Sequence, residues 1–466
     1  MTFLKTPAAR HAAILSLLFG LSAVLAACGD SSSSSSGGGG EGNLSSQSGG
    51  GGEGGEGEGG SDGGASSEAV SSASGDGQTF CFNTGDTIRP NSPIFAYDGV
   101  WYPEYNEAEQ AEYLFRHSPE CRASSACISA ALARIGYDRV HAGAIVRMNF
   151  VSSSDASQRG AQALFSVNPE VAEANWRKPY SAGPSFGVHQ DGVYKGRFTA
   201  MNGYSTTPKA LWINMSDDGN PHTVEVTLPH QLPMRFHGLL VKHDNVCFTV
   251  PSPLDKPVMA VVGNSLAHGE GQNITEETFA WIASRELGYE LVNLAIGGST
   301  ITPEMVSMNF AAAKRVDLAV VEWGFNDWNG GGIAAAKTKF AQVLENIRAV
   351  HATAKIAVIV PFPTLIGTTF NGKTYLQGYG CVQPGTGANA DVGVCTTDST
   401  TIEDWRQMER DVVAERAAAG DANIVVVTPG DLGMEANLTD LVTDGIHLSV
   451  AGAAKFGPLL AAALRQ

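Results

Sequence analysis

Four segments in the second half of the 466-residue chain hold groups that could carry out nucleophilic chemistry. The three that offer reactive side chains contain Ser265, Asn326, and the pair Asp444 and His447. An aspartate three residues before a histidine can accept a hydrogen bond from one ring nitrogen and leave the other facing a serine hydroxyl. The fourth segment, residues 293–299, has adjacent glycines that let the backbone approach a ligand closely. Each segment alone is better explained by a structural role, such as a helix cap or a tight turn, so its meaning depends on the elements that position it.

The elements around these segments predict a parallel sheet. Five short runs rich in Val, Ile and Leu alternate with helical patterns, at residues 258–262, 291–296, 318–321, 356–360 and 424–427. Continuous apolar runs are typical of parallel strands buried on both faces. Their alternation with helices predicts an α/β fold with a doubly wound, five-stranded parallel sheet, in which ligands bind at the carboxyl ends of the strands. The four segments follow the first, second, third and fifth runs, so this fold would bring them to one rim.

With this arrangement, residues 258–466 resemble the SGNH, or GDSL-like, hydrolase family, because all four signature segments are present in order. The resemblance covers a little under half of the chain, and the combination of segments is highly specific. It implies a flavodoxin-like strand order and a serine esterase that works through an acyl-enzyme. In this scheme Ser265 is the nucleophile, His447 the general base and Asp444 the residue that orients His447.

The resemblance also implies an oxyanion hole, which is a set of donors for the oxygen that becomes negative in the transition state. Its members would be the backbone N–H of Ser265, a glycine N–H and the side-chain amide of Asn326. Counting from the start of the glycine segment selects Gly298, and Gly297 remains an alternative. The family's usual Gly-Asp-Ser is here Gly-Asn-Ser, with Asn264 before the nucleophile, and we expect no loss of activity from this change.

Three neighbouring features receive secondary interpretations. His268 is expected to be a loop histidine without a role in proton transfer, because His447 already fills that place. Trp328 either lines the substrate pocket or packs in the core. The Gly- and Thr-rich residues 364–397 form a loop long enough to shape substrate access.

The N-terminus is typical of an exported protein. Lys5 and Arg10 precede an apolar run at residues 12–27, which is too short for a comfortable membrane span. Leu-Ala-Ala-Cys at its end resembles the lipobox of bacterial lipoproteins, so residues 1–27 are predicted to be a signal peptide and Cys28 the lipid anchor. An ordinary secretory cleavage beside an incidental cysteine is the alternative. Both interpretations predict an exported protein. The first also predicts that the protein is anchored to a membrane of the bacterial cell envelope.

Residues 28–79 are predicted to be a disordered tether, because this Gly/Ser/Glu-rich stretch has scarcely any apolar side chain to bury. It holds eight of the 47 acidic residues and no Lys or Arg. The net charge of the whole chain is −17, and the remainder is also acidic, which argues against a nucleic-acid partner.

Six cysteines remain beyond Cys28, and an even number in an oxidising compartment favours disulfides. Of the fifteen possible connectivities we expect the pairs Cys81–Cys247, Cys121–Cys127 and Cys381–Cys395, with free buried thiols as the alternative. Zinc-type spacings such as CxxC and HExxH are missing from the sequence, so neither a metal site nor a cofactor is expected.

Prolines at 251, 253 and 257 suggest a boundary between a β-rich accessory domain at residues 80–252 and the hydrolase domain at residues 253–466. The accessory domain is expected to hold an antiparallel sheet or sandwich. Its predicted strands are 141–151, 196–201, 210–215 and 222–228, and its predicted helices are 107–116 and 124–135. In the second domain, Asn273 and Glu276 have capping-box spacing for a helix over 274–287, and further helices are expected near 403–418 and 451–464.

The preferred interpretation is hydrolysis of short-chain, acetyl-type esters of carbohydrates. It is based on the family's reaction class and on analogy with some two-domain carbohydrate esterases. The alternatives are a lipase or thioesterase-like enzyme on longer acyl chains, and a non-catalytic surface lipoprotein that binds a ligand through its accessory domain.

Overall fold

The computed structural model describes residues 78–134, 143–151, 161–167, 185–199, 206–213, 220–311, 314–328, 332–363, 369–370, 373–374, 402–435 and 446–465. All of the described residues belong to one compact unit of the chain, residues 69–466. Within the described ranges, no helix is both long enough and apolar enough to span a membrane.

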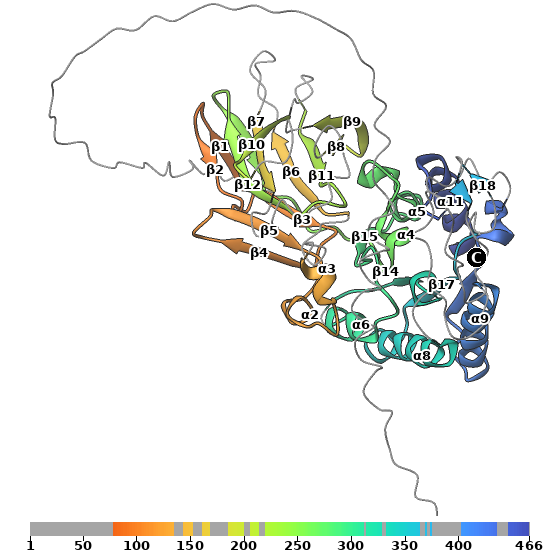
Figure 1. The fold of residues 1–466 in the computed structure, drawn as a ribbon. Helices are drawn as coiled ribbons and strands as arrows, with labels where there is room; N and C mark the ends of the chain where they lie inside the picture. Colours follow the sequence, from red (N-terminus) through yellow and green to blue (C-terminus); the bar gives the residue numbers. More distant parts are fainter. Residues whose placement is uncertain are drawn as a thin grey trace, which may run out of the picture. The chain divides into compact units, whose positions relative to one another are not determined.

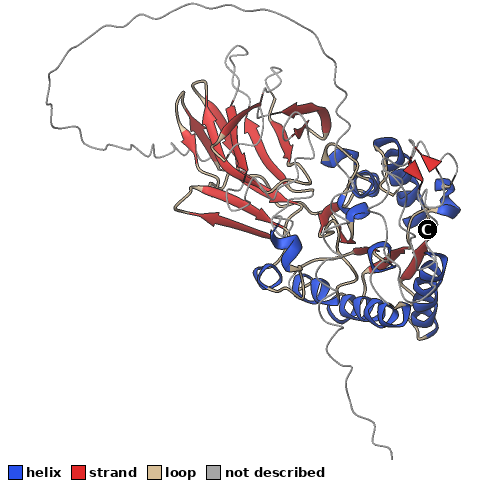
Figure 2. Ribbon diagram, viewed as in Figure 1, coloured by secondary structure: helices blue, strands red, loops and turns tan. Residues whose placement is uncertain are grey.

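The N-terminal part of the described chain is built from two antiparallel sheets, drawn as red arrows in Figure 2. The larger sheet has the order β1-β13-β6-β11-β8-β9, with β3 paired to β6, and the smaller has the order β10-β7-β12-β5-β4, with β2 paired to β12. The strands of the first sheet are β1 (Thr79–Phe82), β3 (Phe95–Asp98), β6 (Ile145–Val151), β8 (Ser185–Gln190), β9 (Val193–Thr199), β11 (His222–Thr227) and β13 (Val246–Thr249). Those of the second are β2 (Thr87–Ile88), β4 (Tyr102–Asn106), β5 (Ala111–Phe115), β7 (Ala161–Val167), β10 (Lys209–Ile213) and β12 (Met234–Val241).

A shared apolar core holds the two sheets together. Phe186 of β8 contacts Phe165 of β7, and Phe165 in turn contacts Phe236 of β12, with ring centroids 4.6 and 5.1 Å apart. All three side chains are fully buried. Because side chains alternate between the faces of a strand, each sheet can contribute one apolar face to this core, which defines the predicted accessory domain as a β-sandwich.

Of the two helices predicted in this region, the one at residues 107–116 is absent, and the one at residues 124–135 is correct only in part. Residues 107–116 contain a turn followed by strand β5, whose five residues are all buried between β4 and β12. Sheet pairing and burial here outweigh the helical propensity of the Glu- and Ala-rich sequence. Of the predicted helix 124–135, the described residues 124–134 begin with a turn and are helical in α3 (Ala130–Arg134), while a short helix, α2 (Pro119–Ala123), precedes them.

The C-terminal part contains the predicted parallel sheet, in the order β15-β14-β16-β17-β20. Numbered along the chain, this is 2-1-3-4-5, the flavodoxin-like order. Its strands are β14 (Val258–Gly263), β15 (Glu290–Asn293), β16 (Leu318–Glu322), β17 (Lys355–Ile359) and β20 (Ile424–Val427). Each of the five overlaps one predicted apolar run.

Helices cover both faces of this sheet (Figure 1). One face packs against α5 (Phe279–Leu287) and α11 (Val450–Leu464), and the other against α6 (Pro303–Asn309), α8 (Ile333–Val350) and α9 (Ile402–Ala418). The remaining elements are the helices α4 (Ser265–His268) and α7 (Phe325–Trp328), a 3₁₀ turn (Thr275–Glu277), a π turn (Gly430–Met434) and the small strands β18 (Thr369–Phe370) and β19 (Lys373–Thr374).

The cap predicted for the first long helix is wrong. The 3₁₀ turn occupies its expected start, and α5 begins after Thr278, whose hydroxyl accepts a hydrogen bond from the N–H of Trp281 at 3.3 Å. Asn273 and Glu276 therefore form no capping box. Gly288 ends the helix with a φ of 76°, a left-handed conformation that glycine adopts without steric cost.

Two disulfides are present among the described residues. Cys81 is bonded to Cys247, which joins the neighbouring strands β1 and β13. Cys121 is bonded to Cys127, and this second bridge ties α2 to the turn before α3. Cys381 and Cys395, the third predicted pair, lie outside the described residues.

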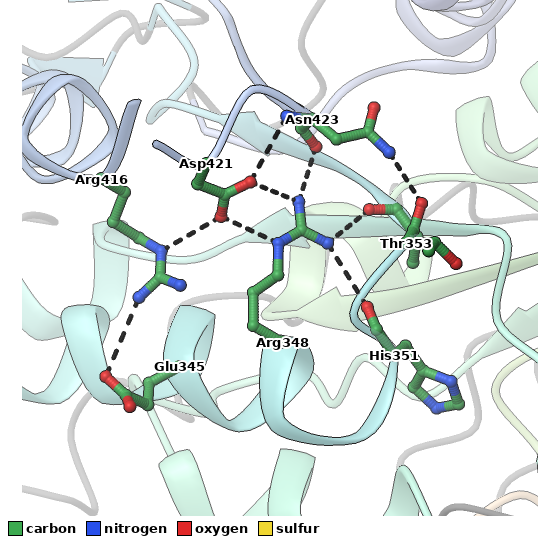
Figure 3. Close-up of polar contacts among 8 residues, drawn as sticks. Glu345, Arg348, His351, Thr353, Arg416, Asp421 and Asn423 are labelled. Atoms are coloured by element: carbon green, nitrogen blue, oxygen red, sulfur yellow. Dashed lines mark hydrogen bonds and ion pairs between the residues drawn. The ribbon is translucent and has the colours of Figure 1, made fainter. Parts of the chain in front are cut away.

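At the amino ends of β17 and β20, an ion pair links α8 to the turn before β20 (Figure 3). Arg348 donates from Nε and Nη2 to the two carboxylate oxygens of Asp421, both at 2.8 Å, and also binds the carbonyl of Asn423 at 2.7 Å. Both charged side chains are largely buried. A bidentate pair with little solvent access stabilises the fold more than an exposed pair does.

We expect Asp421→Asn to lower the free energy of unfolding by about 2 kcal/mol at pH 7, because it leaves the Arg348 guanidinium without its anion. The Arg348 hydrogen bonds lower the pKa of Asp421, so the wild-type advantage is present at neutral pH and is lost as the pH falls below about 4. Urea denaturation at pH 7 and pH 3 measures both effects. Glu415→Gln, which breaks the exposed Lys337–Glu415 pair between α8 and α9, is the matched control and should cost well under about 1 kcal/mol. Equal effects of the two substitutions at pH 7 would contradict the assignment.

Candidate active site

Ser265 lies at the first position of α4, directly beyond the carboxyl end of β14. Asn264 caps this helix, and its side-chain oxygen accepts a hydrogen bond from the N–H of Leu266 at 2.9 Å. Gly263 makes the sharp turn possible, because a Cβ atom there would lie 2.3 Å from the carbonyl oxygen of Glu322 on the adjacent strand. The serine side chain is only partly buried, as a reactive hydroxyl must be.

His447 lies beside this serine although 182 residues separate them in the sequence, with Nε2 2.8 Å from the Ser265 hydroxyl oxygen. The start of α11 fixes its place. Ser449 caps that helix by accepting from the N–H of Gly452, and Gln272 donates to the carbonyl of Leu448. The imidazole can therefore take the serine proton directly.

The glycine segment and the Asn326 segment are joined to each other at the same rim. The side-chain nitrogen of Asn326 donates to the carbonyl of Ser299 at 2.9 Å, and the carboxylate of Asp327 accepts from the N–H of Ile301. The hydroxyl of Ser299 in turn donates to the carbonyl of Gly263, at the end of β14. An amide nitrogen carries two hydrogens, so Asn326 retains one for a bound ligand.

The two glycines differ in what their N–H groups can do. The Gly297 N–H donates to Nδ1 of His268 at 3.3 Å, and Gly297 is buried. Gly298 is exposed and has a φ of 80°, which places it in the left-handed region that glycine tolerates. This difference favours Gly298 over Gly297 as a donor to bound substrate.

A buried carboxyl group, that of Glu322, contacts the nucleophile's helix, and a second buried carboxyl group, that of Glu409, interacts electrostatically with it; no sequence pattern predicted either. Glu322 ends β16, and its Oε2 accepts from the N–H of Ala267 in α4 at 3.3 Å. Burial raises the pKa of Glu322 well above its ordinary value, against the lowering effect of this hydrogen bond. Burial likewise raises the pKa of Glu409, with a further rise from the charge of Glu322. At position 264 an asparagine therefore supplies the cap without adding another carboxylate beside Glu322.

The accessory domain also contributes polar contacts to this site, which no sequence pattern predicted. The buried guanidinium of Arg116 donates to the carbonyls of Asn293 and Ala295, at 3.1 and 2.6 Å, in the glycine segment. His230 and Gln231 both bind the carbonyl of Gly269, directly after α4, at 2.9 and 3.2 Å. No local pattern distinguishes these three residues from ordinary surface polar residues, so their role is visible only once both domains are folded together.

Several predicted site features lie outside the described residues. They are Asp444, Cys28, the side chain of Trp328 and most of the loop 364–397. Among the residues that the structure does describe, no cluster of His, Cys, Asp or Glu is suited to hold a metal ion.

The sheet order and the Ser265–His447 pair at its carboxyl edge define the fold class of the C-terminal part as that of the SGNH, or GDSL-like, hydrolases. Residues 261–455 match the model of the GDSL-like Lipase/Acylhydrolase family, so this part of the chain is a GDSL-like lipase/acylhydrolase domain. A comparison with curated proteins gives no match to the sequence.

Several solved structures are similar to this chain at low sequence identity. The salicylyl-acyltransferase SsfX3 from a tetracycline biosynthetic pathway is 16% identical, with a TM-score of 0.63, over 82% of this chain and 97% of its own. A protein from Bacteroides ovatus described as a GDSL-like lipase is 15% identical, with a TM-score of 0.55, over 80% and 98% of the two chains. A family two carbohydrate esterase from Clostridium thermocellum is 14% identical, with a TM-score of 0.47, over 70% and 92%. The first two alignments extend beyond the hydrolase domain, so both parts of the chain have counterparts there.

Proposed function

We propose that the protein is an exported serine esterase that hydrolyses carboxylic esters through an acyl-enzyme. The observation that carries this proposal is the 2.8 Å contact between the Ser265 hydroxyl and His447 Nε2, within a GDSL-like hydrolase domain. Ser265 and Asn326 are partly exposed and Gly298 is exposed, and all three follow strands of the parallel sheet at its carboxyl edge. Nucleophile, base and N–H donors at one rim are what acyl transfer requires.

The reaction would proceed in two steps. Ser265 Oγ attacks the ester carbonyl carbon while its proton passes to His447 Nε2, and His447 then gives the proton to the departing alcohol. A water molecule, deprotonated by the same nitrogen, attacks the acyl-enzyme and releases the acid and the free serine. In both steps the carbonyl oxygen becomes negative, and the N–H groups of Ser265 and Gly298 and the amide of Asn326 would stabilise it.

For the substrate we propose short acyl esters, with acetylated carbohydrate as the preferred class. The two-domain layout and the predicted surface tether support this choice by analogy. The test compares initial rates on p-nitrophenyl acetate, butyrate and decanoate, followed by acetate release from an acetylated polysaccharide. Preference for acetate and release from the polysaccharide are expected. A preference for decanoate would overturn the substrate class in favour of lipids.

The proposed location depends on Cys28 as the lipid anchor. We expect Cys28→Ser to move the protein from the membrane fraction to the soluble fraction, because the thiol that would be acylated is lost. Immunoblotting of fractionated cells measures the distribution, and Ser36→Ala in the predicted tether serves as the control, since it changes a side chain near Cys28 without removing a thiol. If the Cys28 variant remains with the membrane, the anchor is a different one.

A further inference from the structure

His268 lies in the last position of α4, three residues after Ser265, and is fully buried. Its ring is hydrogen-bonded at both nitrogens. Nε2 lies 3.0 Å from the carbonyl of His230 in the accessory domain, and Nδ1 lies 3.3 Å from the N–H of Gly297. A carbonyl can only accept, so Nε2 carries the hydrogen and Nδ1 is the bare nitrogen that accepts from Gly297.

The surroundings keep the ring in this neutral form. Burial lowers the pKa of His268 well below its ordinary value, and the nearby positive charge of Arg116 lowers it further. A protonated ring would turn a second N–H toward that of Gly297 and break the contact. Arg116 also donates hydrogen bonds to two carbonyls of the same glycine segment. This one accessory-domain side chain therefore supports the segment directly, through these bonds, and indirectly, by keeping His268 neutral.

The contact connects the two parts of the site that must be aligned. His268 is in the same helical turn as Ser265, and Gly297 directly precedes Gly298. The N–H of Gly298 belongs to the next peptide unit, so anchoring the Gly297 amide fixes one end of the short segment that aims it. Donors aimed at the developing oxyanion must be held in place before reaction to be effective.

We propose that His268 is a positioning residue for the oxyanion hole, which holds the Gly297–Gly298 segment in register with Ser265 and is itself held by the His230 carbonyl of the accessory domain. This inference is based on the proposed function, because it assumes that Gly298 donates to a reacting oxygen. It departs from the sequence-based expectation that His268 is an uninvolved loop residue.

Two substitutions separate the two hydrogen bonds of the ring. In His268→Asn the side-chain oxygen can occupy the place of Nδ1 and keep the bond from Gly297, while the bond to His230 is lost. In His268→Gln the longer side chain reaches the place of Nε2 and keeps the bond to His230, while the bond from Gly297 is lost. Each variant loses one hydrogen bond, so a purely structural role predicts equal effects on melting temperature and on activity.

We expect His268→Gln to lower kcat on p-nitrophenyl acetate roughly 10- to 100-fold with KM changed less than about 3-fold, since the loss falls on the transition state. His268→Asn should rescue most of this loss. The rate of phosphonylation of Ser265 by a fluorophosphonate, followed by intact mass, should show the same order, because the phosphonyl oxygen occupies the same hole.

Wild-type kcat in His268→Gln, or equal losses in both variants with equal falls in melting temperature, would overturn the inference. Different results would overturn the proposed function. If the wild-type protein hydrolyses no ester but is phosphonylated at Ser265, the esterase proposal is wrong, and the labelling rates of the two variants still decide the role of His268. A wild-type protein that is not phosphonylated overturns both.

Discussion

Ser265→Ala is expected to lower kcat on p-nitrophenyl acetate by a factor on the order of 10⁶, because it removes the hydroxyl that is placed to form the acyl-enzyme. The rate that remains should exceed the uncatalysed rate by roughly 10³, since the oxyanion donors would still bind the substrate in place. KM should change little, because the hydroxyl contributes mainly to the transition state. Steady-state kinetics with purified protein measures both parameters.

The matched control is Ser307→Ala, which removes an exposed hydroxyl in α6 that donates to the carbonyl of Glu304 in the same helix. This variant should match the wild type in kcat and melting temperature. Equal activity of Ser265→Ala and wild type would show that the nucleophile is another residue. Equal activity together with fluorophosphonate labelling at a different serine would identify that residue directly.

His447→Ala is expected to have an effect of similar size, on the order of 10⁶ in kcat, because it removes the base that lies against the serine hydroxyl. The two residues act as one unit, so the double variant Ser265→Ala/His447→Ala should be no slower than either single variant. Additive losses would contradict the direct proton transfer that the 2.8 Å contact suggests.

His351→Ala is the control for this substitution. It removes a partly buried histidine that follows α8, near the amino end of β17 and therefore away from the carboxyl edge that holds Ser265. Its activity should stay within about 3-fold of wild type. A comparable loss in both histidine variants would mean that the His447 effect reflects folding, which circular dichroism and the melting temperature would also show.

The hydrolase fold was predictable because its local and long-range signals agree. Runs such as residues 258–262 and 318–321 are apolar throughout, and the structure buries them as β14 and β16 in the middle of the sheet. The strand order then places the ends of these strands at one edge, which is why segments far apart in the sequence could be assigned to one site.

The accessory domain was less predictable because its signals conflict. Residues 107–116 have helix-favouring composition, but non-local pairing with β12 makes β5 a strand. The contacts of Arg116 and His230 are also non-local, because their partners lie 177 and 39 residues further along the chain. No single-sequence pattern encodes such distances. The predicted domain limits at residues 28, 80 and 253 stay predictions, as does the role of Asp444.

The bridge between Cys81 and Cys247 has a mechanical consequence. A pull on the chain ahead of Thr79, such as a surface anchor would exert, acts first on β1. At Cys81 the force passes through the covalent sulfur bridge to Cys247, 166 residues further on, and from there it enters the hydrolase domain at Val258. The load therefore has a covalent path from β1 to β13 that bypasses, along the chain, the strands between these two cysteines, which lowers the force on their hydrogen bonds.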